Sequence, residues 1–288
     1  MVSIQRLFAR LQAVSPRLAG GAALFLFTHP LPPAIRSDAE KRLTQRARRK
    51  LVEAEHSMVR AHGYRIATYR FAHSALQRRG TVLLVHGWTS AAAFMTAPVE
   101  HLRALGYDVV AFDLPAHGKS SGRKAEMMDC ALVLGAVATR HGPIDQVIAH
   151  SFGGPVTTLA LASDLSPGLT DETRLHFIAS PNRLADVTAQ FAAALGLSRE
   201  TQTIFESAVV APFGVDLDAM DGNLLLGDRP NPITILHSRD DLEVTYDAAE
   251  KFARLGKQVQ LRTLDGLGHR RILHARPSME ALVEAVTA

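Results

Sequence analysis

The stretch that decides the fold of this chain is Val147-Ile148-Ala149-His150-Ser151-Phe152-Gly153-Gly154. An apolar run ends at a serine with small residues near it on both sides, and a segment of helical pattern follows. This order predicts a buried strand, a sharp turn and a helix, with the serine hydroxyl held clear of the sheet. A glycine usually stands where Ala149 is, and alanine is the mildest replacement because the position needs only a small side chain.

Outward from this stretch, short apolar runs alternate with helical patterns. A strand hairpin is predicted over 58–72 around Gly63. The runs typical of strands covered on both faces are 81–85, 109–112, 147–149, 175–178, 233–236 and 259–261, and the helical patterns are about 91–104, 123–140, 152–163, 244–255 and 277–287. This alternation predicts an α/β fold, with a mostly parallel, doubly wound sheet and helices on both faces.

The chain divides into parts of different pattern. Residues 1–57 form a basic, helical N-terminal extension, and residues 58–181 and 231–288 form the α/β core. The interval 182–230 separates two strands, carries no strand signal and contains short helical pieces. A long insertion of this kind near a site is typical of a lid, so a small, moderately apolar helical lid is expected there.

The N-terminal extension has two features. An amphipathic segment is followed by the apolar stretch Leu18–Phe27, which is too short to span a bilayer because spanning needs ~20 residues. Ser37-Asp38-Ala39-Glu40 resembles a capping box that opens a further helix. The simplest interpretation is a helix packed on the core or its entrance. The alternatives are contact with a membrane surface through residues 1–50, and a signal peptide, which Leu31-Pro32-Pro33 fits poorly.

Charge and cysteine content exclude several classes of protein. The net charge of +4 arises in residues 1–60, where eleven Lys and Arg outnumber four Asp and Glu, while the remainder of the chain is slightly acidic. A nucleic-acid-binding body is therefore not expected. The single cysteine, Cys130, permits no internal disulfide and no cysteine metal cluster, and its helical context indicates a buried thiol. A cytoplasmic protein, with or without attachment to a membrane surface, is expected.

Polar residues stand directly after several of the predicted strands. Because ligands bind beyond the carboxyl ends of strands in an open α/β sheet, these residues are candidates for a site. Ser151, Asp240 with Asp241, and His269 follow three such strands; Asp241 lies 90 residues after Ser151 and His269 another 28 after that. A serine hydroxyl needs a base to become a nucleophile, and the base needs a carboxylate to fix its tautomer.

At these positions the chain resembles the α/β-hydrolase superfamily over roughly residues 64–288. The resemblance is carried by motifs in the right order at the predicted strand ends: His86-Gly87-Trp88, Asp113-x-Pro115-x-His117-Gly118-x-Ser120, Ala149-x-Ser151-x-Gly153, Asp241-x-x-Val244 and Gly268-His269. It implies catalysis by Ser151, Asp241 and His269, with Asp240 as the alternative acid. It also implies an oxyanion hole made of the backbone N–H groups of Trp88 and Phe152.

This resemblance implies a serine hydrolase that cleaves a carboxylic ester through an acyl-serine intermediate. Branches of the superfamily that use an aspartate nucleophile are disfavoured by Ser151. The alternatives are an acyltransferase, a thioesterase or a lyase on the same triad, and a non-catalytic binding protein. Trp88 and His150 are candidates for the substrate pocket, and the substrate is expected to be a small ester with an apolar portion. No cofactor is expected, and no metal, because His86, His117 and His269 lack metal-ligand spacing.

Overall fold

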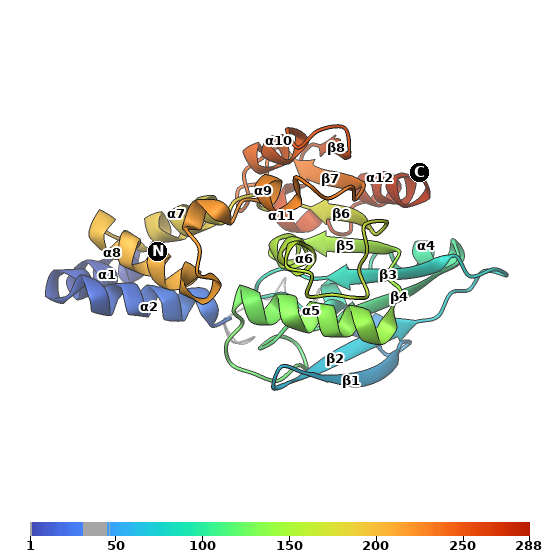
Figure 1. The fold of residues 1–288 in the computed structure, drawn as a ribbon, viewed down its shortest axis with the longest axis horizontal. Helices are drawn as coiled ribbons and strands as arrows, with labels where there is room; N and C mark the ends of the chain where they lie inside the picture. The colour runs from blue at the N-terminus through green and yellow to red at the C-terminus, as the bar shows by residue number, and fades with distance from the viewer. Residues whose placement is uncertain (1, 31–44, 46) are drawn as a thin grey trace.

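The computed structural model of the chain describes residues 2–30, 45 and 47–288. Its centre is an eight-stranded sheet with the strand order β1-β2-β4-β3-β5-β6-β7-β8 (Figure 1). Strand β1 pairs antiparallel with β2, β2 pairs antiparallel with β4, and all other neighbours are parallel. The strands are β1 Glu55–Ala61, β2 Tyr64–Phe71, β3 Gly80–Val85, β4 Tyr107–Phe112, β5 Gln146–His150, β6 Arg174–Ile178, β7 Ile233–Ser238 and β8 Val259–Leu264.

Four strands in the interior of the sheet are buried along their whole length. Every residue of β3, β4, β5 and β7 is buried, which explains why these strands appear in the sequence as unbroken apolar runs without alternation. The edge strand β1 is mostly exposed and carries polar side chains. The predicted fold class, a mostly parallel α/β sheet with helices, is confirmed.

Helices cover both faces of the sheet. Side chains of α5, α6 and α10 pack in one hydrophobic core, and those of η2, α4 and α12 pack in a second core on the other face. The expected helix over 91–104 is two pieces, η2 and α4, because Pro98 lies between them. The bounds are η2 Ala92–Met95, α4 Val99–Ala104, α5 Met127–His141, α6 Gly153–Ala162, α10 Asp247–Ala253, α11 Gly268–Arg271 and α12 Arg276–Thr287.

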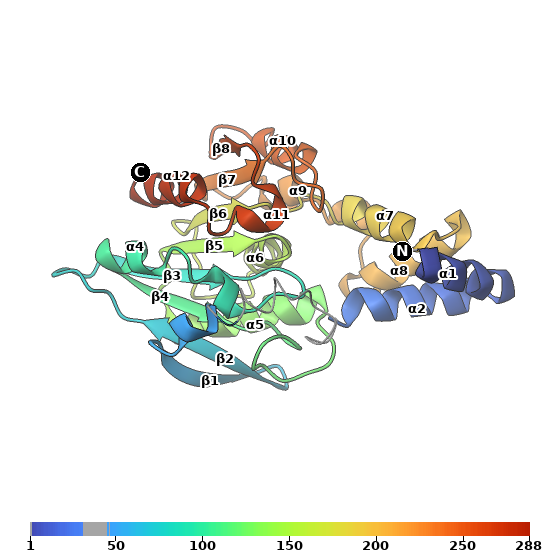
Figure 2. The same cartoon turned by 180° about the vertical axis from the view of Figure 1, so that it is seen from behind.

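A helical lobe projects from one end of the sheet (Figures 1 and 2). It combines the two N-terminal helices with the first two helices of the interval between β6 and β7, which is helical as predicted. The helices of the N-terminus are α1 Val2–Val14 and α2 Pro16–Thr28, and those of the interval are α7 Leu184–Leu195, α8 Arg199–Val210, η3 Ala211–Phe213, η4 Leu217–Ala219 and α9 Gly222–Leu226. We call α1, α2, α7 and α8 the helical lobe.

The helical lobe has a hydrophobic core of its own. Its buried members come from both parts of the chain: Phe8, Ala19, Ala23, Leu195 and Phe205. Helix α2 packs closely on α8, since a Cβ added at Gly20 would lie 2.8 Å from Cγ2 of Ile204. The side chain of Gln12 also binds the turn between α7 and α8, donating to the carbonyl of Gly196 (3.1 Å) and accepting from the amide of Ser198 (2.8 Å).

Two remaining expectations concern the N-terminal region. The capping box at Ser37–Glu40 lies outside the described residues, although residues 47–51 are helical. Within the part of the chain that the structure describes, no helix has the length and apolarity needed to cross a membrane.

Candidate active site

Ser151 lies in a sharp turn between β5 and α6. Its φ of +51° places a non-glycine residue in the left-handed region, which costs about 1 kcal/mol or more and persists only where the surroundings hold it. Three hydrogen bonds do so. The Ser151 amide donates to the carbonyl of Ile178 (3.0 Å), while the Ser151 carbonyl accepts from the Gly154 amide (2.9 Å) and the Ser180 hydroxyl (2.8 Å).

Close packing around this turn explains the small residues of the motif. A Cβ at Gly153 would lie 2.6 Å from the carbonyl oxygen of Val85 in β3, and one at Gly87 would lie 2.9 Å from Cβ of Ser151. Ala149 is completely buried in β5. Helix α6 begins at Gly153, two residues after the serine, and its N-terminal dipole favours negative charge there.

The structure brings Ser151, His269 and Asp241 into one hydrogen-bonded chain, which we call the Ser–His–Asp array. Nδ1 of His269 lies 2.8 Å from Oδ2 of Asp241, and Nε2 of His269 lies 3.0 Å from Oγ of Ser151. An ionised carboxylate only accepts hydrogen bonds, so Nδ1 carries the proton and Nε2 is left free to accept from the serine hydroxyl. This is the geometry that a base needs to activate a hydroxyl.

Asp241 is built to remain ionised although its side chain is fully buried. Burial alone would raise the pKa of Asp241, but the hydrogen bond and charge of His269, together with backbone amides, hold that pKa below its usual value. The amides of Glu243 and Val244 each donate to Oδ1 at 2.9 Å. His237, which follows the strand signal of 233–236, supports this loop by donating from Nε2 to the carbonyl of Val244 (2.9 Å).

Asp240, the alternative acid, has a different set of partners. Its carboxylate accepts from the Ser238 hydroxyl and from the Gly268 amide (3.3 Å), and the Ser238 hydroxyl accepts from the Leu267 amide (3.1 Å). These bonds tie the loop after β7 to the loop before α11. Asp240 therefore braces the backbone next to His269, whereas Asp241 contacts the imidazole itself.

The backbone N–H groups of Trp88 and Phe152 have no hydrogen-bond acceptor among the described residues. The rings of these two residues pack edge to face with their centroids 5.5 Å apart. His86 and His117 shape the neighbouring turns, because Nε2 of His86 accepts from the Leu114 amide (3.0 Å) and Nε2 of His117 accepts from the Thr89 amide (3.1 Å). Two unpaired donors beside Ser151 can receive a negatively charged oxygen.

His150 lies beneath the array and is not among the residues that line the cavity described below. Its Nε2 donates to the backbone carbonyl of His269 (2.9 Å), and the two rings pack with centroids 4.8 Å apart. Burial, with the nearby His269, lowers the pKa of His150 to about 3, so its ring is neutral. The interpretation of His150 as a pocket residue is therefore replaced by a supporting position under His269, and Trp88 is the candidate that lines the cavity.

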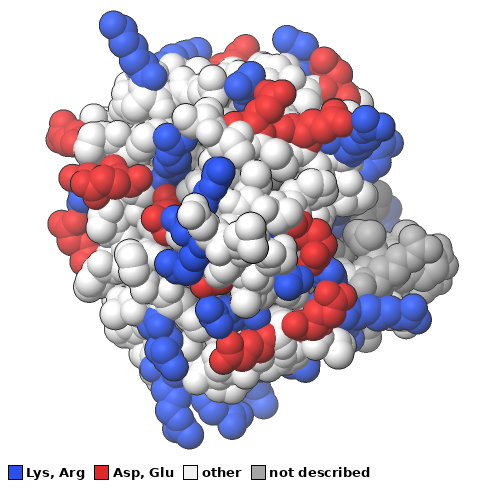
Figure 3. Space-filling view, turned by 90° about the vertical axis from the view of Figure 1, so that its right-hand side faces the viewer, with Lys and Arg blue, Asp and Glu red and all other residues white. Residues whose placement is uncertain are grey.

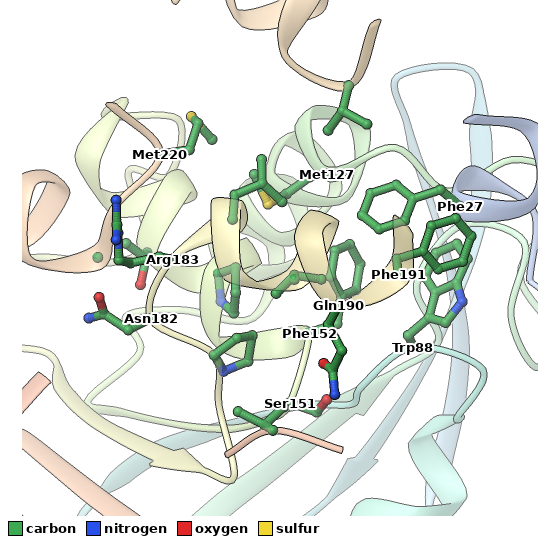
Figure 4. Close-up of a pocket in the computed structure, with 18 of the residues that line it drawn as sticks. Phe27, Trp88, Met127, Ser151, Phe152, Asn182, Arg183, Gln190, Phe191 and Met220 are labelled. Carbon is green, nitrogen blue, oxygen red and sulfur yellow. The ribbon is translucent and has the colours of Figure 1, made fainter. Parts of the chain in front are cut away.

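A cavity of about 510 Å³ opens onto Ser151 and His269, a size typical of small-molecule sites. The core contributes Trp88, Phe152 and Val244 to its wall. In Figure 4, Phe27, Phe191 and Trp88 gather on one side of Ser151, and Asn182, Arg183 and Met220 lie on the other. We call the first group the aromatic side of the cavity.

The helical lobe supplies much of the cavity wall. The sequence predicted helices near the site over 182–230 and an N-terminal helix packed on the core or its entrance, but not which of their side chains line the cavity. Helix α2 contributes Leu24, Phe27 and Thr28, and the lining residues from α7 and α8 are Leu184, Val187, Gln190, Phe191, Ala194, Ala208 and Val209. Phe27 packs edge to face on Phe191 (5.1 Å between centroids) and on Phe205 (5.3 Å). The apolar spacing of Leu18–Phe27 indicated a packed helix, but only the fold brings it beside a serine more than a hundred residues away.

Within the described ranges, no group of three or more His, Cys, Asp or Glu side chains is arranged to hold a metal ion. The single cysteine is fully buried in α5, where burial raises the pKa of the Cys130 thiol well above its usual value.

A family model for the alpha/beta hydrolase family matches residues 82–285, and the chain belongs to this family. A search of curated proteins gives no match. Solved structures share the fold at low identity. A membrane phospholipase A described as a bacterial virulence factor aligns over 86% of this chain and 92% of its own, with 17% identity and a TM-score of 0.61.

Two further structures are similar to this chain. Est1E from Butyrivibrio proteoclasticus, solved with bound ferulic acid, aligns over 80% of this chain and 96% of its own, with 19% identity and a TM-score of 0.61. The thioesterase domain from the curacin biosynthetic pathway aligns over 82% and 99%, with 16% identity and a TM-score of 0.57. At these identities the likeness concerns the fold alone.

Proposed function

We propose that this protein is a serine hydrolase that cleaves carboxylic esters through an acyl-serine intermediate. The observation that carries the proposal is the Ser–His–Asp array at the floor of a largely apolar cavity. A scaffold that only binds a ligand has no need for a serine, an imidazole and an ionised carboxylate in hydrogen-bond contact.

In the proposed reaction, Nε2 of His269 takes the proton of Ser151 as Oγ attacks the ester carbonyl carbon. The tetrahedral oxyanion accepts hydrogen bonds from the amides of Trp88 and Phe152. His269 then gives its proton to the leaving alkoxide, which departs as an alcohol. Water, deprotonated by His269, then attacks the acyl carbon. The bond to Oγ of Ser151 breaks, His269 returns the proton to Oγ, and a carboxylic acid is released, while Asp241 stabilises the imidazolium in both halves of the reaction.

We also propose that the insertion over 182–230 acts as a lid, and that the aromatic side of the cavity receives an apolar portion of the ester. Support comes from the wall itself, where Phe27, Phe191 and Val209 converge from three different helices. Each methylene that leaves water for such a wall contributes about 0.8 kcal/mol, so longer apolar chains should gain affinity.

Hydrolysis of a series of p-nitrophenyl esters, from acetate through butyrate and decanoate to palmitate, tests the proposal. We expect turnover that requires Ser151 and a higher kcat/KM for decanoate than for acetate. Product analysis with an added alcohol distinguishes hydrolysis from acyl transfer. Free acid should remain the main product, whereas a dominant new ester would identify an acyltransferase.

The aromatic side can be tested separately with Phe27→Ala. Removing this ring should lower kcat/KM for the decanoate ester about tenfold or more, because a wall of the acyl site is lost, and leave acetate turnover within about twofold. Phe25→Ala is the matched control, since Phe25 is exposed on the same helix and does not line the cavity. Equal losses on both esters would assign Phe27 a purely structural role.

A further inference from the structure

The hairpin of α1 and α2 exposes an unusual number of large apolar side chains. Ten such side chains are exposed among the described residues, and four of them lie on this hairpin, although it holds only about a tenth of those residues. The four are Leu7 at 51% exposed, Val14 at 81%, Leu18 at 61% and Phe25 at 57%. The other side of the hairpin is occupied by the core of the helical lobe, so these side chains have no packing role there.

The turn of the hairpin is the part of the lobe that lies farthest from the sheet. Figures 1 and 2 show the turn between α1 and α2 at the extremity of the molecule. Val14 and Leu18 flank this turn, which is kept compact because the hydroxyl of Ser15 accepts from the Leu18 amide (3.3 Å). A protruding tip with apolar side chains on both sides of a tight turn can insert into the headgroup region of a bilayer without unfolding.

The charge of the hairpin has a single sign. Arg6, Arg10 and Arg17 are exposed on it, and no Asp or Glu occurs anywhere in residues 1–37. The opposite end of the molecule differs, because its face carries Lys and Arg interspersed with Asp and Glu (Figure 3). Positive charge beside exposed apolar side chains is the combination that binds anionic lipid headgroups while burying apolar groups at the acyl boundary.

We propose that the tip of the α1–α2 hairpin docks the protein on an anionic membrane surface. Val14 and Leu18 enter the interface, and Arg10 and Arg17 bind lipid phosphates. The opposite end of α2 carries Leu24, Phe27 and Thr28 in the cavity wall. At a rise of 1.5 Å per residue, the lining residues of α2 lie between about 12 Å (Leu24) and about 18 Å (Thr28) along the helix from Pro16 at the docked tip. Docking needs neither Ser151 nor its chemistry, so it stands or fails independently of the proposed function.

Vesicle sedimentation with full-length Ser151→Ala protein tests the docking without any turnover. We expect binding to vesicles of equal parts phosphatidylcholine and phosphatidylglycerol, and little binding to phosphatidylcholine alone. The double variant Val14→Gln, Leu18→Gln should bind at least about tenfold more weakly, because two apolar side chains no longer enter the interface. Each replacement of Arg10 or Arg17 by Gln should cost about fivefold at low salt.

The double variant Val52→Gln, Leu76→Gln is the matched control, because both positions are exposed at 77% or more and lie outside the hairpin. It should bind like the parent protein. The circular dichroism spectrum should be unchanged for all of these variants. Turnover of the butyrate ester, measured in protein that keeps Ser151, should also be unchanged. Absence of binding to anionic vesicles, or equal binding by the hairpin variant, would overturn the proposal. A dimer in light scattering that the hairpin variant abolishes, without vesicle binding, would assign the tip to self-association instead.

Discussion

The strand-end site, which consists of Ser151, Asp241 and His269, borders the same cavity as the helical lobe. The two regions are held together in different ways. At the strand ends, single hydrogen bonds fix single atoms, as in the contacts of His269 with Ser151 and Asp241. In the lobe, apolar surfaces fix whole helices, with Phe8, Ala23 and Phe205 in a shared core. We therefore expect catalysis and substrate selectivity to be separable: substitutions of single hydrogen-bonding groups should change the first, and substitutions in the packing of the lobe should change the second.

The largest expected effect concerns the nucleophile. Ser151→Ala should reduce ester turnover by a factor of about a thousand or more, since no other group replaces the acyl acceptor. His269→Ala should cost a similar factor, because the two residues act as a unit. Steady-state kinetics with the butyrate ester measures both. The double variant Ser151→Ala, His269→Ala should lose little more turnover than either single variant. A loss equal to the product of the two single losses would mean that the two residues act independently.

The neighbouring acids give the second prediction. Asp241→Asn should lower kcat by about ten thousandfold, because the amide favours the wrong imidazole tautomer. Asp240→Asn should change kcat by less than about threefold, because Asp240 only braces the loops beside His269. Kinetics of the pair on one ester makes the comparison. The reverse ranking would move the acid to Asp240.

The third prediction concerns the contact between α2 and α8 in the helical lobe. Gly20→Leu should displace α2 from α8, because even a Cβ at this position would lie 2.8 Å from Ile204. We expect kcat/KM for the decanoate ester to fall about tenfold while acetate turnover changes little. Gly21→Leu is the control, since no atom lies within 4 Å of a Cβ at that position. An equal loss on both esters would mean that the two regions are not separable.

The smallest effect concerns the stability of the core at low pH. Burial lowers the pKa of His176 to about 3, while the unfolded chain titrates near 6.5. Between these values the unfolded state binds a proton that the folded state does not. The contribution of His176 to stability is therefore complete above about pH 6.5, and it is lost at about 1.4 kcal/mol per pH unit as the pH is lowered.

Urea unfolding between pH 6 and pH 4 measures this slope. His176→Gln should reduce the slope of unfolding free energy against pH by about 1.4 kcal/mol per pH unit, the value for one proton. Glutamine can still donate to Gln146, but it does not titrate. His101→Gln, at an exposed position of α4, is the matched control. An unchanged slope in the His176 variant would mean that this histidine is protonated in the folded protein.

The strand-end site was largely predictable from the sequence, whereas the lobe was predictable only as separate helices near the core. Ser151 and Asp241 follow the buried strands β5 and β7, and His269 follows the half-buried edge strand β8. Parallel strands bring their carboxyl ends to one edge of the sheet. The amphipathic pattern of α1 and the apolar run of α2 predicted helices but not their partners. Whether Phe27 meets Phe191 depends on packing between segments far apart in the sequence, which local periodicity does not encode.

His150 illustrates a finer limit. Its position beside Ser151 made it a candidate for the pocket, but alternate residues of a strand face opposite sides of the sheet, and the turn then redirects the chain. The structure places its ring under His269 instead. Asp240 and Asp241 are likewise adjacent in the sequence but differ in their contacts. Asp240 accepts from the Ser238 hydroxyl, and Asp241 contacts His269.

Covalent labelling of the folded protein with a fluorophosphonate, followed by intact-mass measurement and peptide mapping, shows whether Ser151 is an activated nucleophile. We expect a single adduct on Ser151, formed much more slowly in His269→Ala and Asp241→Asn and at the wild-type rate in Asp240→Asn. A folded protein that remains unlabelled, or that carries its adduct on another residue, would contradict the claim that Ser151 is an activated nucleophile.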